Sequence, residues 1–270
     1  MAKRTCTFCG GGNLTKEHVL PRWLSKVVSF DNSTGELRGD AEYNEVARRS
    51  IPISPGERQV RNVCAGCNQG WMSDLETATE PVLTPLILGE ERTLTAEEVD
   101  VLALWAAKTA VTTQFVMRDS GEIPRRQAAQ IFERQRPAAE MQVFIAQMAE
   151  PWGVACIPDR VHFGARRVIT LGSASRVERL RVVLYATTIT LERAVIQVIG
   201  TSDRMLYEPP RFAEEFEGIR RIWPRPRPLT LPRERLLTDR ELALMTYGRL
   251  HEMREGLVEL SRVAEQRGQP

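Results

Sequence analysis

The sequence Cys6-Thr7-Phe8-Cys9 is matched about 55 residues later by Cys64-Ala65-Gly66-Cys67. Zinc in structural sites takes four ligands in a tetrahedron, and two cysteines separated by two residues supply two of them from one tight turn. Gly10 follows Cys9, and glycine suits the sharp turn that such a pair needs. The two pairs therefore predict one structural zinc site of four thiolates, with a substantial insert between its halves.

Composition and the remaining cysteine are consistent with this reading. The chain has 270 residues and five cysteines, and the fifth, Cys156, stands in an apolar stretch as a small buried side chain would. Paired spacing favours a metal over disulfides in a reducing compartment. No stretch approaches the roughly 20 apolar residues that span a bilayer, and the N-terminus has no apolar signal region. We therefore expect a cytoplasmic protein without membrane contact.

A second motif lies inside the insert. Glu17-His18-Val19-Leu20-Pro21 follows the first cysteine pair, and Asn68 comes directly after the last cysteine. In this order residues 5 to 80 resemble the HNH endonuclease family in its zinc-containing form. The resemblance implies a ββα-metal, treble-clef-like fold, in which a hairpin bears the acid–histidine pair and a helix begins at or just after the second cysteine pair. It also implies that His18, Glu17 and Asn68 are catalytic, with His18 as general base and Glu17 and Asn68 as ligands of a catalytic divalent metal, Mg or Mn.

The residues themselves suit phosphodiester hydrolysis. A histidine with a pKa near its reference of about 6.5 can take a proton from water at neutral pH, and a hard cation on oxygen ligands can stabilise the developing charge. Neighbours on an extended strand point to opposite faces. Glu17 and His18 therefore share a site only if the strand bends or a helix adds ligands. In the family that this segment resembles, an asparagine a few residues before the second cysteine pair orients the histidine. The nearest counterparts here are Gln59 and Asn62.

Candidate substrate-binding residues are the basic side chains near this motif: Lys16, Arg22, Arg58 and Arg61. Gathered on one face, they would form an electrostatic footprint for a phosphate backbone. The net charge is only +2, and interspersed acids make a solvated mixed surface almost equally compatible with the sequence. Of the downstream residues, Trp71 is expected to pack on the zinc knuckle, and Asp74 and Glu76 to be solvated or capping residues.

The whole chain reads as an α+β protein in three parts. Residues 1–90 form the HNH-like zinc module, 91–208 an α+β accessory domain, and 209–270 a proline- and arginine-rich arm followed by a long helix. The accessory domain holds a helix over 94–119, whose apolar stripe Lys108 interrupts, and a shorter one from Pro124 to about Gln135. Runs rich in Val, Ile and Thr predict an antiparallel sheet from the segments Met141–Met148, Gly153–Ile157, Arg167–Leu171, Arg179–Thr190 and Ala194–Gly200.

The last part is read as an extended arm or linker over 208–235, because Arg-Pro pairs alternate there. An amphipathic helix from Thr238 to about Gln266 follows, and it is expected to pack on the sheet or to pair with another copy in a homo-oligomer.

Together these observations favour a metal-dependent endonuclease that hydrolyses phosphodiester bonds in nucleic acid. The resemblance favours DNA over RNA, and host defence or mobile-element biology is a candidate setting. The alternative that the sequence leaves open is a non-catalytic, zinc-organised module that binds nucleic acid or regulates a partner.

Overall fold

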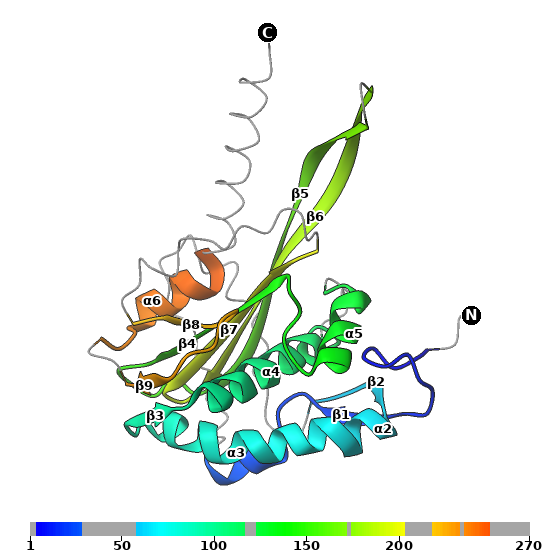
Figure 1. Ribbon diagram of the computed structural model, residues 1–270. Coiled ribbons are helices and arrows are strands. Elements are labelled where there is room, and N and C mark those ends of the chain that lie inside the picture. Colours follow the sequence, from blue (N-terminus) through cyan, green and yellow to red (C-terminus); the bar gives the residue numbers. More distant parts are fainter. Residues whose placement is uncertain are drawn as a thin grey trace.

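The chain folds as an α+β protein, as expected (Figure 1). The computed structural model describes residues 4–28, 58–116, 123–171, 174–202, 218–232 and 235–248, and over 163–180 it describes the backbone alone. None of the helices in these segments is long and apolar enough to cross a membrane.

A short antiparallel pair opens the fold. Strands β1 (Leu14–His18) and β2 (Gln59–Cys64) pair with an irregularity between Thr15 and Glu17. A short 3-10 helix, η1 (Arg22–Lys26), follows β1. Helical chain follows β2 through α2 (Ala65–Cys67), η2 (Asn68–Met72) and α3 (Ser73–Leu88), with a kink at Gly70, whose φ of −97° and ψ of −118° are not helical. The order strand, strand, helix is the one that the resemblance implies.

A five-stranded antiparallel sheet forms the centre of the molecule, in the order β5-β6-β7-β4-β8. Its strands are β4 (Met141–Gln147), β5 (Val154–Leu171), β6 (Ala174–Leu191), β7 (Ala194–Thr201) and β8 (Arg220–Trp223). The prediction of two separate strands over 153–171 is wrong. Residues 158–162 keep pairing with 183–187 of β6, and Pro158 is tolerated because β5 lies at the edge of the sheet, where one side needs no donor.

The proline-rich segment is not a free linker over its described part, which corrects the interpretation of 208–235. Strand β8 pairs with β4, and β9 (Leu229–Leu231) pairs with β3 (Arg92–Leu94). Ile222 and Leu231 are almost fully buried. Apolar residues between the prolines are thus what fixes this segment to the rest of the fold.

Helices cover both faces of the sheet (Figure 1). Side chains alternate along β4: Val143 and Ile145 join the core beneath α3 and α4 (Ala96–Thr113), whereas Phe144 and Ala146 join a second cluster with α6 (Asp239–Ala243). The first core is continuous from Cys6 to Leu231. The segment that carries the four N-terminal cysteines and the sheet therefore share one hydrophobic core.

The predicted helices are confirmed where the structure describes them. The segment 94–119 contains α4, and Pro124 precedes α5 (Arg125–Arg134). The capping box from Thr238 to Glu241 is present at the start of α6, which continues into η5 (Leu244–Gly248). Leu242 and Met245 pack on the sheet, while the rest of the expected C-terminal helix lies outside the described residues.

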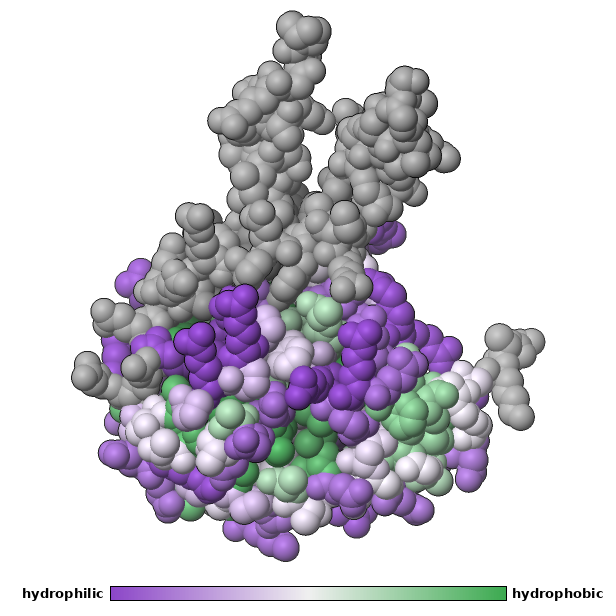
Figure 2. All heavy atoms as spheres, viewed as in Figure 1, coloured by the Kyte–Doolittle hydropathy of each residue, from purple (hydrophilic) through white to green (hydrophobic). Residues whose placement is uncertain are grey.

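Figure 2 shows hydrophilic side chains over most of one face, with apolar ones in small areas between them. Leu88, 54% exposed, is the single large apolar side chain classed as exposed in the part of the chain that is described.

We expect Thr95→Ala to lower the free energy of unfolding by about 1 kcal/mol. Thr95 Oγ1 accepts the N–H of Glu98 at 3.2 Å and Glu98 Oε2 accepts the N–H of Thr95 at 2.9 Å, which caps α4. Denaturant unfolding measures the loss. Thr95→Asp keeps an acceptor at the cap and should remain near the original stability; an equal loss in both variants would contradict the capping role.

Candidate functional site

Four cysteines come together at one end of the β1–β2 pair. Cys6 and Cys9 lie in the turn before β1, Cys64 ends β2 and Cys67 ends α2. Their sulfur atoms all lie within 4.8 Å of one another, and Cys9 Sγ is 3.4 Å from Cys64 Sγ. In the described part of the chain this is the one place where at least three Cys, His, Asp or Glu ligand atoms lie close enough to hold an ion.

The turn around the first pair has the features of a metal knuckle. Gly10 has a φ of +73°, which glycine adopts without strain. The N–H of Gly11 points at Cys9 Sγ at 3.4 Å, and the N–H of Cys67 points at Cys64 Sγ at 3.5 Å. Backbone donors aimed at sulfur stabilise thiolates, and the donor set of four sulfurs is typical of structural zinc.

An arginine of α5 and the aromatic side chain of Trp71 contact the turn that carries Cys6 and Cys9. Arg125 of α5 donates to the carbonyls of Thr5 and Cys6, both at 3.1 Å. Trp71 packs edge-on against Phe8, with ring centroids 5.3 Å apart. The expectation that Trp71 packs on the knuckle is confirmed.

The thiols resist ionising together in the absence of a cation. Burial raises the pKa of Cys67 and of Cys9. Burial also raises that of Cys6, but backbone hydrogen bonds at Cys9, Cys64 and Phe8 outweigh it and lower the Cys6 pKa to about 7. A divalent ion removes this conflict, because it offsets the charge that four thiolates would place together. The residues therefore fit a structural zinc.

His18 lies at the other end of the strand pair. Leu14 pairs with Cys64 and His18 with Gln59, so four residues of strand, roughly 13 Å, separate the two ends. The cysteine cluster therefore holds the hairpin and the helix together without contacting the histidine.

Gln59 contacts the histidine directly, with its Nε2 2.7 Å from His18 Nε2. An amide nitrogen only donates, so in this arrangement His18 Nε2 accepts and the ring proton is on Nδ1; turning the amide over would reverse both roles. Asn62 instead donates to Thr7 Oγ1 at 3.3 Å and supports the knuckle. Of the two candidates, the structure therefore brings Gln59 to the histidine.

Asn68 reaches across to β1. Its Nδ2 lies 3.1 Å from both Thr15 Oγ1 and Lys16 O, the carbonyl of the peptide that joins Lys16 to Glu17. Using the amide hydrogens here fixes the orientation of Asn68 and leaves Oδ1 on the side away from that carbonyl. Because Cys67 directly precedes Asn68, the position of the cysteine cluster determines the position of the Asn68 backbone.

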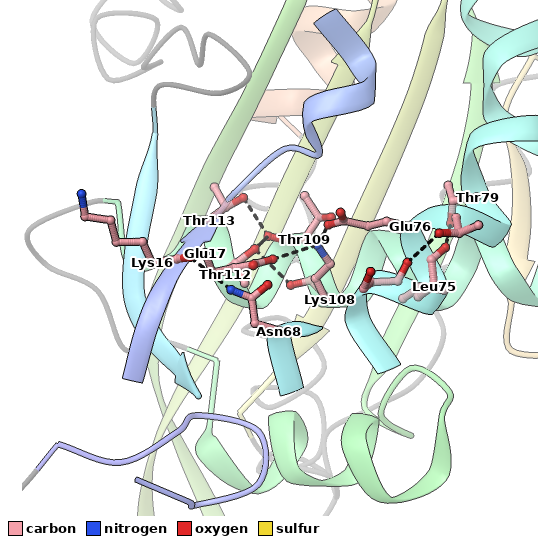
Figure 3. Close-up of polar contacts among 12 residues, drawn as sticks. Lys16, Glu17, Asn68, Leu75, Glu76, Thr79, Lys108, Thr109, Thr112 and Thr113 are labelled. Carbon is pink, nitrogen blue, oxygen red and sulfur yellow. Dashed lines mark hydrogen bonds and ion pairs between the residues drawn. The ribbon is translucent and has the colours of Figure 1, made fainter. Parts of the chain in front are cut away.

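Glu17 is 5% exposed and contacts Lys108, the buried lysine that interrupts the apolar stripe of α4 (Figure 3). Lys108 Nζ, on the fully buried side chain from α4, lies 3.5 Å from Glu17 Oε1 and 2.8 Å from Glu76 Oε1. Glu76 is therefore not merely solvated or capping, which corrects that expectation. The sequence contained a signal for these contacts. A lysine in an apolar helix stripe is almost never buried without a charged partner, so Lys108 indicated that acidic side chains lie beside it.

Burial raises the pKa of Glu17, and Glu76 raises it further, while Lys108 opposes both. Glu17 and His18 hold consecutive regular positions in the ladder, opposite Val60 and Gln59. Glu17 accordingly faces the core and His18, partly exposed, faces Gln59. The irregularity in β1 falls before Glu17, so it does not turn the two side chains to one face, and Asn68 from the helical side is what approaches this part of β1.

An oxygen-bound divalent ion is compatible with these residues. The lysine contact uses Oε1 of Glu17, and the strand contacts of Asn68 use its amide hydrogens. Carboxylate and amide oxygens are ligands that Mg²⁺ accepts. Glu17 and Asn68 are the residues that would hold such an ion.

The four predicted substrate-binding residues are all exposed: Lys16, Arg22, Arg58 and Arg61. Lys16 points away from the Glu17–Lys108 contact (Figure 3). A separate cavity of about 530 Å³ is lined by Arg134, Arg136, Pro137, Ala139 and Trp223. It shares no residue with the cysteine cluster or with the His18 region.

Comparison with family models, with curated proteins and with solved structures finds no match for this chain. The geometry described above is therefore the basis for assigning function.

We expect the purified protein to hold about one zinc per chain, because four thiolates complete one tetrahedron. Cys64→Ser should remove the zinc and destabilise the fold, as measured by metal analysis and thermal unfolding. Cys156→Ala is the matched control, since Cys156 is buried outside the cluster, and it should keep the zinc. Zinc retained in Cys64→Ser would show that the four sulfurs do not form one site.

Proposed function

We propose that this chain is a divalent-metal-dependent endonuclease of the HNH type, with β1, β2 and the helix from Ala65 as its ββα-metal module. The observation that supports this best is the arrangement at the end of the hairpin. His18 is held by Gln59 at 2.7 Å, and Asn68 is bonded to the peptide carbonyl that precedes Glu17. Glu17 and His18 thus hold adjoining positions of one strand with their side chains on opposite faces, and Asn68 approaches the same part of the strand from the helix.

In the proposed reaction His18 accepts the proton of the attacking water, whose oxygen then bonds to phosphorus as the bond to the leaving oxygen breaks. For this step the Gln59 amide is turned so that its Oε1 accepts the Nε2–H of His18, which orients the imidazole and leaves the basic lone pair on Nδ1. A divalent ion, Mg²⁺ or Mn²⁺, supplies charge stabilisation at the phosphate and the leaving oxygen when bound. Glu17 and Asn68 provide its protein ligands.

The substrate class follows from the charges around the hairpin. Lys16, Arg22, Arg58 and Arg61 are exposed, and they present cations to a phosphate backbone. We propose DNA as the substrate, because the resemblance favours it, and RNA of the same sequence is the comparison in the assay.

Cleavage of plasmid DNA in Mg²⁺ or Mn²⁺ tests the enzyme directly. His18→Ala should lower the rate by roughly 10²- to 10⁴-fold, the usual contribution of a general base, and EDTA should abolish cleavage. His162→Ala changes an exposed histidine on β5 and should leave the rate unaltered. Equal rates in His18→Ala and the original protein would refute the assignment of the base.

Gln59→Ala tests the positioning residue separately. We expect kcat to fall about tenfold with little change in KM, because the imidazole loses its fixed orientation while the substrate surface is intact. Arg61→Ala, on the same strand, should instead raise KM and weaken the dependence of binding on salt. A rise in KM alone for Gln59→Ala would show that Gln59 contacts substrate rather than positions His18.

One observation favours the alternative of a non-catalytic, zinc-organised binding module. Glu17 already has a cationic partner in Lys108, so its charge is partly neutralised without a metal. Binding of nucleic acid without cleavage, across Mg²⁺, Mn²⁺ and both DNA and RNA, would establish that alternative.

A further inference from the structure

The Glu17–Lys108–Glu76 cluster draws its members from three separate elements: β1, α4 and α3. Lys108 is completely buried, and its ammonium contacts both carboxylates. The side chains of Glu17 and Glu76 are 7% and 25% exposed, so the cluster is closed at the lysine, nearly closed at Glu17 and partly open at Glu76. The lysine cannot itself reach a substrate, so it can act on chemistry only through the two carboxylates, of which Glu17 is the proposed metal ligand.

The charges do not balance inside this cluster. With both acids ionised, two carboxylates and one ammonium leave a net charge of −1. A divalent ion at Glu17 would change the sum to +1, which is unfavourable in a partly buried site beside a fixed ammonium. One phosphodiester group would return the sum to zero. Mg²⁺ sites in which one or two carboxylates act together with substrate phosphates follow the same pattern.

From this charge balance we propose that Lys108 is a built-in cation that keeps the divalent metal weakly bound until a nucleic-acid phosphate arrives. The inference rests on the proposed function, because it assumes that the ion binds at Glu17. Lys108 is a positioning residue. Its ammonium contacts Oε1 of Glu17 and, being positively charged, repels a divalent ion bound to the same carboxylate. Metal and nucleic acid then bind cooperatively, since each supplies the charge that the other needs.

Two substitutions should move metal affinity in opposite directions. Lys108→Met removes the ammonium at nearly constant shape, leaves a charge of −2 and should tighten Mn²⁺ binding about tenfold or more. Glu76→Gln removes one negative charge and leaves the lysine to Glu17 alone, so Mn²⁺ binding should weaken by a similar factor. A purely structural role for the cluster would weaken binding in both variants.

The experiment uses the full-length, zinc-loaded chain in a His18→Ala background, which keeps DNA intact. Free Mn²⁺ is followed by electron paramagnetic resonance during titration, with and without a short DNA duplex. We expect the duplex to tighten Mn²⁺ binding about tenfold or more in the parent and much less in Lys108→Met. Glu80→Gln, one turn further along α3, is the matched control and should bind Mn²⁺ like the parent.

Adding Glu17→Gln to Lys108→Met should abolish the gain in affinity, which assigns that gain to Glu17. The inference is overturned if Lys108→Met binds Mn²⁺ no more tightly, if both single variants weaken it, or if no Mn²⁺ binds. Should Lys108→Met fail to fold, Lys108→Gln, which also removes the ammonium, takes its place in both titrations. Absence of DNA cleavage by the original protein refutes the nuclease instead, and it does so independently of the Mn²⁺ titrations.

Discussion

The closure of a 55-residue span by four sulfur atoms is the constraint on which the N-terminal part depends. Cys64 is both the last residue of β2 and a member of the cluster, and Cys67 immediately precedes Asn68. An ion that binds these sulfurs therefore fixes the start of the helix relative to the strand pair. The amide of Asn68 then meets the carbonyl of Lys16, and β1 is held against the helix at the position before Glu17. An ion bound there would add to the apolar core that this part of the chain shares with the sheet.

The same region is also bound to the rest of the chain. Arg125 holds the backbone of the first knuckle, and the apolar core continues from the cysteines beneath the sheet. Lys108 adds a polar connection, because α4 carries the cation for an acid on β1 and another on α3. A buried ion pair of this kind contributes little net stability, but removing one partner leaves a buried charge at considerable cost. The two carboxylates that contact this single buried ammonium make the geometry around Glu17 specific.

The sequence was sufficient for the features that depend on spacing. The approach of the two cysteine pairs, the helix that starts at Thr238 and the strands in the Val-, Ile- and Thr-rich runs follow local rules, and the structure confirms them. Partners distant in sequence were harder to infer. Whether Gln59 or Asn62 would meet His18 depended on the register of β2, which an irregularity in β1 shifts. The acids that would accompany Lys108 could not be identified from the helix alone, and Arg-Pro alternation concealed two short strands.

The position of Lys108 has a consequence for how this protein can be divided. A boundary drawn at residue 90 would separate the acids of the cluster from their ammonium, even though the four clustered cysteines and the histidine motif lie on one side of it. Such a fragment would retain its zinc ligands yet carry two neighbouring carboxylates with no internal counter-charge. The hairpin is therefore not electrostatically independent of the rest of the chain, because Lys108 of α4 supplies the positive charge that its acids contact. Duplication or fusion of the motif would have to include α4.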